Sequence, residues 1–229
     1  TQEENIRAEN ITFVRDNREL VEEGRHWGCL KEFARLVLTT PDRIEIEFGD
    51  EAIVRKALRN CIDFIAPDIP DLVKLAELRC ESQSLHIEMV LYAACLEIMR
   101  AGNDLQNINT KLLIALRTGT QIHYTAVLDE ERTALKAEID RLVLSNPVSS
   151  ENFLRQYVEP QLARPGCINP DVWLLQREKI FNHLRSKLSV EWLGRFNDIT
   201  SEPLDTLFEI AAQYGNRAEL QKIILERCA

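Results

Sequence analysis

The sequence predicts an all-α protein, and three observations carry that prediction. Apolar residues recur at three- and four-residue spacing along nearly the whole chain, which is the period of helices with one buried face. Glycine and proline are scarce, with eight of each in 229 residues, which disfavours a β-rich or disordered chain. Residues that cap helix N-termini recur at almost constant spacing in the second half of the chain. We expect about eleven helices, stacked as antiparallel helical hairpins.

Residues 1–102 are expected to form an irregular N-terminal helical unit. Its first segment carries Ile6, then Phe13 with Val14 and Leu20 with Val21, at seven-residue intervals, and it stops at a glycine. The segment 85–100 is apolar on all sides, so we expect it to be buried between several neighbours. The expected helices of this unit cover residues 2–23, 27–38, 51–66, 71–80 and 85–100.

One short stretch of this unit has the periodicity of a strand. Ile44, Ile46 and Phe48 alternate with polar residues over residues 43–48. The stretch has no partner strand elsewhere in the sequence. We therefore expect an extended connector or the ragged start of the next helix.

Residues 109–229 are expected to form a more regular array, which a loop at 102–109 separates from the first unit. Helix-start signals in this array lie about twenty residues apart. They are Asn109, Asp129, Ser149 or Ser150, Asn169 and Ser189. Each precedes an apolar-periodic stretch, and these stretches cover residues 111–117, 130–144, 151–162, 171–188 and 190–196. Two more helices are expected after residue 200.

This spacing resembles that of HEAT-type α-solenoids, because about twenty residues per helix and turn give about forty per hairpin. The resemblance implies a protein that presents a binding surface. Two stretches, 60–70 (NCIDFIAPDIP) and 208–228 (FEIAAQYGNRAELQKIILERC), also resemble the helical C-terminal regions of bacterial NACHT-type signalling ATPases. That resemblance implies a sensor or regulatory portion, with the ATPase outside this sequence, since the GxxxxGK[ST] nucleotide loop is absent. The chain starts with Thr1, and we expect it to be a piece of a longer protein.

Charge and hydropathy narrow the classes of partner. The 28 Lys and Arg against 37 Asp and Glu give a net charge of −9, which disfavours nucleic acid and anionic membranes as ligands. The longest apolar run, 89–96, is far shorter than the roughly 20 residues that cross a bilayer. Residues 1–20 are too polar for a signal peptide. We expect a cytoplasmic protein without a membrane segment.

The cysteines and histidines predict neither a metal site nor another cofactor. The six cysteines show no CxxC or CxC pair and are Cys29, Cys61, Cys80, Cys95, Cys167 and Cys228. We expect reduced, buried thiols, with disulfides as the less favoured alternative. No two of the four histidines are close enough in sequence to share a metal ion, and no HExxH motif occurs.

One catalytic interpretation remains open. Three of the four histidines follow an arginine by six or seven residues, and this resembles the Arg…His pair of HEPN-type ribonucleases. The resemblance implies that the pair would polarise a scissile phosphate and move protons. Helix phase discounts two of the three pairs, and only Arg117 and His123 could converge, across a bend between them.

The three tryptophans offer a possible interaction surface. Trp27, Trp173 and Trp192 each lie early in an expected helix. The simpler interpretation is that they pack on the preceding hairpin. The alternative is an aromatic lining of a concave face, where a partner peptide or helix would bind.

These observations favour a non-catalytic interaction or regulatory module from a larger cytosolic signalling protein. Its partner would be another protein or the remainder of its own polypeptide. The first alternative is a metal-independent ribonuclease that uses Arg117 and His123. The second is a structural spacer, or a subunit that buries an exposed helix face in an oligomer.

Overall fold

The computed structural model describes residues 2–228, and every regular element in that range is a helix. The all-α prediction is therefore confirmed. Fifteen α-helices and three short 3-10 helices occur among these residues. The sequence led us to expect about eleven helices, and the number is higher because several expected helices are split.

The chain divides into two compact units. Unit 1 combines the residues up to Pro70 with residues 85–142, and unit 2 combines residues 71–84 with those from Val143 onward. The expected boundary at 102–109 falls inside unit 1, so the expected array 109–229 is shared between the two units. The division differs because the short segment 71–84 packs with residues that follow it by more than sixty positions.

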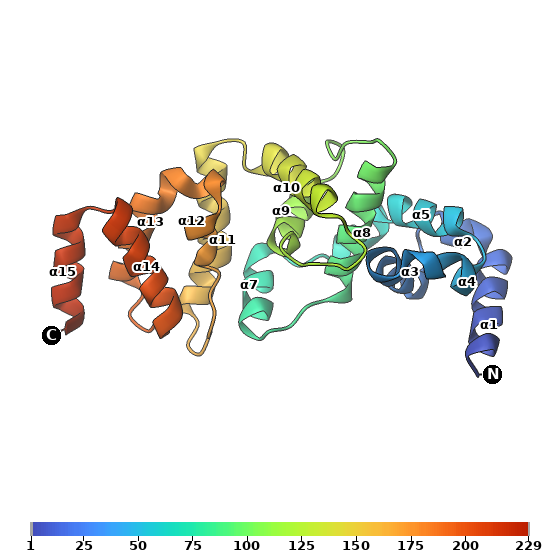
Figure 1. Ribbon diagram of the computed structural model, residues 1–229, viewed down its shortest axis with the longest axis horizontal. Helices are drawn as coiled ribbons and strands as arrows, with labels where there is room; N and C mark the ends of the chain where they lie inside the picture. Colours follow the sequence, from blue (N-terminus) through green and yellow to red (C-terminus); the bar gives the residue numbers. More distant parts are fainter. Residues whose placement is uncertain (1, 229) are drawn as a thin grey trace. The chain divides into compact units, whose positions relative to one another are not determined.

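Unit 1 is a cluster of helices around one central helix. Its α-helices are α1 (Gln2–Asp16), α2 (Arg18–Glu22), α3 (Trp27–Thr39), α4 (Ile44–Phe48), α5 (Glu51–Asn60), α6 (Ile62–Ile65), α8 (His86–Arg100), α9 (Thr110–Gly119) and α10 (Asp129–Val143). Two 3-10 helices, η1 (Pro41–Arg43) and η2 (Ala66–Asp68), connect them. The central helix α8 packs against α3, α5 and α9 (Figure 1). All its residues from Val90 to Ile98 are at most 9% exposed, which confirms the expected burial on several sides.

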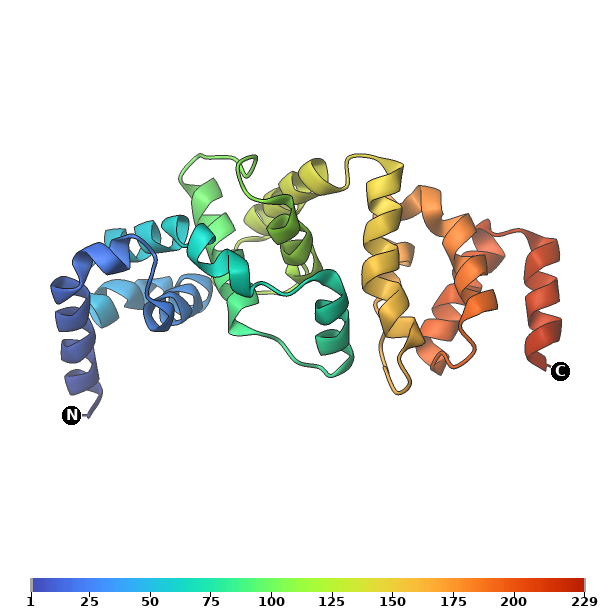
Figure 2. The same cartoon turned by 180° about the vertical axis from the view of Figure 1, so that it is seen from behind.

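Unit 2 is assembled around the long helix α11. Its α-helices are α7 (Leu72–Cys80), α11 (Pro147–Ala163), α12 (Trp173–Arg177), α13 (Arg185–Arg195), α14 (Ser201–Tyr214) and α15 (Arg217–Cys228), with the 3-10 helix η3 (Lys179–Leu184). Helix α7 lies against α11, and α13 lies against α14 (Figure 2). The first pair joins distant parts of the chain, whereas the second is a hairpin of consecutive helices.

Residues 43–48 form no strand and no extended connector. Apart from Arg43, which ends η1, they form the short helix α4. Ile44 and Phe48 lie one turn apart and are both buried, whereas Ile46 is 54% exposed. The alternating pattern therefore also fits a helix whose buried face uses positions i and i+4. Gly49, with φ of +74°, ends that helix in the left-handed region.

The first helix starts of the predicted array are right. Asn109 caps α9 by accepting a hydrogen bond from the Lys111 N–H at 2.9 Å. Asp129 is the first residue of α10. The next start is earlier than predicted, because Asn146 caps α11 by accepting from the Ser149 N–H at 3.0 Å.

The last two predicted helix starts are wrong. Asn169 lies in the loop before α12, which begins four residues later. Ser189 is buried inside α13, where its hydroxyl donates to the Arg185 carbonyl oxygen at 2.6 Å. The twenty-residue spacing therefore does not extend to this part of unit 2.

The expected helix 171–188 is broken into α12, η3 and the start of α13. Glu178 separates α12 from η3 with an extended backbone (φ −88°, ψ 118°). The Arg185 guanidinium donates to the carbonyl oxygen of Leu175 at 2.9 Å and to that of Gln176. It thus satisfies carbonyl groups at the end of α12 that a continuous helix would have paired internally.

Candidate functional site

The structure does not bring Arg117 and His123 together as a surface pair. The Arg117 residue is 1% exposed, and its guanidinium forms an ion pair with Asp140. Its Nη1 also donates to the Thr120 hydroxyl at 3.3 Å. The His123 side chain is 66% exposed and its Nε2 lies 3.9 Å from Asp129. In this conformation an RNA phosphate has no access to the guanidinium, so the geometry gives the ribonuclease interpretation no support.

The three tryptophans do not share one surface role. Trp192 is fully buried, and its indole N–H donates to Glu159 at 3.1 Å. Trp173 is half-buried, and its indole N–H donates to Asp171 at 2.7 Å. Trp27 is 40% exposed. The prediction of an aromatic interaction surface is therefore wrong for Trp192, and among the described tryptophans Trp27 keeps the most open side chain.

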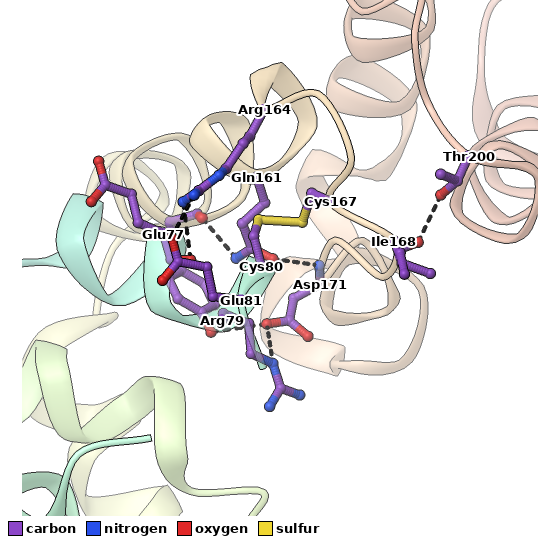
Figure 3. Close-up of a disulfide and its surroundings, with 11 residues drawn as sticks. Glu77, Arg79, Cys80, Glu81, Gln161, Arg164, Cys167, Ile168, Asp171 and Thr200 are labelled. Carbon is purple, nitrogen blue, oxygen red and sulfur yellow. Dashed lines mark hydrogen bonds and ion pairs between the residues drawn. A yellow bond between two sulfur atoms is a disulfide. The ribbon is translucent and has the colours of Figure 1, made fainter. Parts of the chain in front are cut away.

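A buried carboxylate organises the centre of unit 2. Asp171 is 3% exposed, and its Oδ2 accepts a hydrogen bond from the Tyr157 hydroxyl at 2.8 Å. Arg79 Nε, from α7, lies 3.3 Å from the same oxygen (Figure 3). The backbone N–H of Asp171 donates to Gln161 at 3.0 Å. Together with the bond from Trp173, these contacts satisfy both carboxylate oxygens, as a buried charge requires.

Next to this carboxylate, Cys80 and Cys167 form a disulfide across 87 residues of sequence (Figure 3). The expectation of reduced thiols is wrong for this pair. Arg164 reinforces the same junction, because its Nη1 donates to the Glu77 carbonyl oxygen at 3.2 Å and its Nη2 pairs with Glu81. No local motif indicates this bridge, since neither cysteine belongs to a CxxC or CxC pair.

The other described cysteines are buried thiols, as expected. Burial raises the pKa of the Cys29 thiol to about 11 and that of Cys61 to about 12. Burial also raises the pKa of Cys95. These groups are therefore protonated at neutral pH and are poor nucleophiles. The side chain of Cys228 lies outside the described part of the chain.

Ion-pair clusters lock helices together in both units. In unit 1, the Glu97 carboxylate is 1% exposed and accepts from Arg55 at 2.7 Å and from Arg100 at 2.9 Å. Arg100 also donates to Glu131 at 2.7 Å, and this hydrogen bond is the main cause that lowers the pKa of Glu131. The cluster therefore ties α5, α8 and α10 together.

In unit 2, Arg155 occupies the corresponding role between α11 and α13. Its guanidinium donates two hydrogen bonds to Glu191, at 2.6 and 2.7 Å. It also contacts Glu151 and Glu159 on its own helix. The hydrogen bond from Arg155 is the main cause that lowers the pKa of Glu191. Such bidentate pairs fix helix register.

The surface of α1 and α2 carries an unusual row of apolar side chains. Ile6, Phe13 and Leu20 are 48%, 36% and 40% exposed. Backbone hydrogen bonds bridge the junction of α1 and α2, from the Asn17 N–H to the Phe13 carbonyl oxygen at 2.9 Å and from the Val21 N–H to that of Asn17 at 3.0 Å, although Asn17 itself leaves the helical conformation (φ −115°, ψ 31°). Ile6 and Phe13, which are seven residues apart, therefore lie on one face of α1, and Leu20 is the exposed apolar residue of α2. We call Ile6, Phe13 and Leu20 the N-terminal stripe.

The N-terminal stripe lies beside the start of α3. The ring of Phe13 is 4.8 Å from that of His26, centroid to centroid. His26 caps α3, because its Nδ1 accepts from the Cys29 N–H at 3.1 Å. The exposed Trp27 follows directly in the chain. Trp27, one of the three tryptophans suggested for an interaction surface, therefore directly follows His26, which contacts Phe13 of the stripe.

Residues 2–228 contain neither a metal-binding cluster nor a membrane-spanning helix, and the sequence has no significant match among known proteins. Within residues 2–228, no group of three or more His, Cys, Asp or Glu side chains is arranged to hold a metal ion. None of the described helices combines the length and apolarity needed to span a bilayer. The sequence matches no family of known proteins, and neither curated proteins nor solved structures give a significant match.

Proposed function

We propose that this protein is a non-catalytic interaction module and that the N-terminal stripe is its docking face. The exposure of Ile6 and Phe13 on α1 and of Leu20 on the following helix α2 carries the proposal. Val14 of α1 and Val21 of α2 are at most 2% exposed, so each helix already buries one apolar side chain beside the exposed ones. A contiguous apolar patch of this kind is a usual mark of a protein-binding site.

The partner that fits this face is an amphipathic helix with basic flanks. The stripe has the seven-residue spacing along which two helices pack. Residues 2–23 carry seven acidic and three basic side chains, so the rim of the stripe is negative. A cationic helix would bury its apolar face on the stripe and place its Lys or Arg residues beside that rim.

The arrangement of the polar groups supports a non-catalytic role. The guanidinium of Arg117 is enclosed with Asp140, and the carboxylate of Asp171 is occupied by side chains of its own unit. The described free thiols are buried. These groups stabilise packing, and none of them presents an open position to a substrate.

Two finer parts of the proposal concern architecture and origin. We propose HEAT-like stacking of helical hairpins, which the packing of α13 on α14 and of α14 on α15 supports. We also propose that the chain is the regulatory part of a larger cytosolic signalling protein of the bacterial NACHT type. The support for this origin is the resemblance of residues 60–70 and 208–228 to such proteins.

The test is a calorimetric titration of the protein with a synthetic Lys/Leu peptide whose leucines follow helical spacing. We expect binding with a Kd of about 1–100 μM. Ile6→Glu and Phe13→Glu should each weaken binding about tenfold or more, because each places a charge in the apolar contact. Val148→Glu is the matched control, since Val148 is 68% exposed and belongs to unit 2.

Several outcomes would overturn the proposal. One is equal binding of a Glu/Leu peptide with the same apolar spacing, and another is binding that both stripe variants retain. Self-association that Phe13→Glu abolishes would replace the partner helix by a second copy of this chain. Metal-independent cleavage of single-stranded RNA that His123→Ala abolishes would replace the binding role by catalysis.

A further inference from the structure

The disulfide involves a segment that lies in sequence between two parts of unit 1 but packs in unit 2. Residues 71–84 pack in unit 2, although the residues before and after them belong to unit 1. The bridge joins Cys80, the last residue of α7, to Cys167 in the loop that follows α11. It is the covalent tie between this segment and the rest of unit 2.

The non-covalent ties of the segment are of two kinds. Leu72, Leu75 and Leu78 are buried on the side of α7 that packs with α11. One polar tie is exposed on both sides, because the Arg164 and Glu81 side chains are 36% and 38% exposed, whereas Arg79, itself 57% exposed, contacts the buried Asp171 carboxylate. The exposed Arg164–Glu81 pair stabilises little, and the contact of Arg79 with Asp171 reaches α7 through a single side chain, so a helix of nine residues gains much of its attachment from the covalent bond.

The two bridged cysteines differ in exposure. Cys167 is 5% exposed, whereas Cys80 is only partly buried. An incoming thiolate therefore reaches Cys80 first. The remaining described cysteines are unpaired buried thiols, which a reducing compartment would also leave unpaired. The bridge is thus the one described cysteine pair in this chain on which a change of redox conditions can act.

We propose that the Cys80–Cys167 disulfide is a redox latch that holds residues 71–84 in unit 2. The reductant is a dithiol, such as a CxxC protein. Its thiolate attacks the Cys80 sulfur, forms a mixed disulfide and releases Cys167 as a thiolate, which takes up a proton. The second thiolate of the dithiol then attacks the first sulfur of the same dithiol, which is bonded to Cys80 in the mixed disulfide. This step closes the disulfide of the dithiol and releases Cys80 as a thiolate, which is also protonated.

The exchange is balanced in atoms and electrons. The protein disulfide gains two electrons and two protons, and the dithiol becomes a disulfide. The result is a segment held only by its apolar contacts and ion pairs. It exchanges between docked and released states, and release uncovers the face of α11 that α7 covers. This latch is independent of the N-terminal stripe, which lies in unit 1.

The experiment is hydrogen exchange measured by mass spectrometry on the full chain, with and without dithiothreitol. Peptide mapping first verifies the Cys80–Cys167 bridge and then its reduction. We expect exchange of the α7 amides to rise about tenfold or more on reduction, while exchange of the α8 amides stays unchanged. Cys167→Ser should show the fast exchange without reductant and no further response. Cys29→Ala should respond as the unmodified protein does.

The proposal is overturned if the bridge is absent from oxidised protein or resists dithiothreitol under native conditions. It is also overturned if hydrogen exchange of the α7 amides stays constant after complete reduction, since the non-covalent contacts alone would then hold the segment in place. A rise in exchange throughout the chain would show a global stabiliser and no local latch. If Cys167→Ser does not fold, the comparison of oxidised with reduced unmodified protein decides the question alone.

Discussion

The hydroxyl of Tyr157 lies 2.8 Å from the Asp171 carboxylate, so a residue of α11 is bonded to the segment that leads into α12. Both residues are 3% exposed. In such surroundings a charged acceptor makes a strong hydrogen bond, and a partner that loses it has no water to replace it. This contact, together with those of Gln161 and Arg79, holds the loop in which the predicted helix 171–188 fails to start.

Substitutions at this contact should destabilise the protein unequally. Tyr157→Phe removes one hydrogen bond and should cost about 1–2 kcal/mol of unfolding free energy. Asp171→Asn should cost about 2–4 kcal/mol, because it removes the charge opposite Arg79 and places an amide N–H₂ among hydrogen-bond donors. The measurement is urea unfolding followed by circular dichroism. The double variant should lose less than the sum of the two, and strict additivity would show that the contact carries no energy.

Local features of the fold could be predicted from the sequence, because they depend on residues within one helical turn. Asn109 caps α9 through an N–H two residues away, and that spacing is visible in the sequence. The burial of α8 follows from its apolar character on all sides. The pattern of Asn146, Pro147 and Ser149 was equally local and could have identified the start of α11.

The remaining features depend on partners that are distant in sequence. The helix that Asn169 was expected to start is replaced by a loop in which the Asp171 carboxylate contacts Tyr157 and Arg79. The bridge between Cys80 and Cys167 spans 87 residues and has no local motif. Arg117 carried a weaker local sign, since Leu113 one turn before it is also buried. An arginine one turn after an apolar residue can lie on the packed face of its helix, and Arg117 does so.

Trp27 and Trp192 should differ sharply in their effect on stability. Trp192→Ala empties a fully buried site and leaves Glu159 without its indole donor, so it should cost about 3–5 kcal/mol. Trp27→Ala removes a side chain that is 40% exposed and should change stability by about 0.5 kcal/mol or less. Urea unfolding of both variants measures the difference. A large loss for Trp27→Ala would show that Trp27 has a packing role.

Stability should fall at acidic pH, and the ion-pair clusters give the direction. Hydrogen bonds from Arg100 and Arg155 lower the pKa of Glu131 and of Glu191 below the ordinary value of 4.5. Protons therefore bind the unfolded chain more readily than the folded one. The stabilisation is complete above the unfolded pKa and is lost as pH falls through the lower folded value. Urea unfolding at about pH 7 and at about pH 4 measures the loss.

Removal of the arginine provides the control for this pH effect. Arg155→Gln should be less stable than the unmodified protein near neutral pH, because Glu191 loses its bidentate partner. Its stability should also depend less on pH below about pH 5, since the pKa of Glu191 returns toward the unfolded value. An unchanged pH dependence in this variant would assign the acid sensitivity to other carboxylates.

Gly24 and Gly102 form a matched pair that separates backbone conformation from packing. Both follow a helix of unit 1 with a left-handed backbone, at φ of +70° and +80°. In both, the next N–H reaches back to a carbonyl in the helix, from Arg25 to Leu20 at 3.2 Å and from Asn103 to Ile98 at 3.2 Å. Their surroundings differ. A Cβ on Gly24 would lie 2.5 Å from the Ala57 carbonyl oxygen, whereas one on Gly102 would meet nothing within 4 Å.

Alanine at each glycine should therefore have a different cost. Gly102→Ala carries only the conformational penalty and should lose about 1–2 kcal/mol of unfolding free energy. Gly24→Ala adds a clash with backbone atoms of α5 and of the residue after it, which cannot rotate away, and should lose at least about 2 kcal/mol more. Urea unfolding of the two variants gives the comparison. Equal losses would mean that α2 and α5 separate easily, and the packing that supports the N-terminal stripe would then be weak.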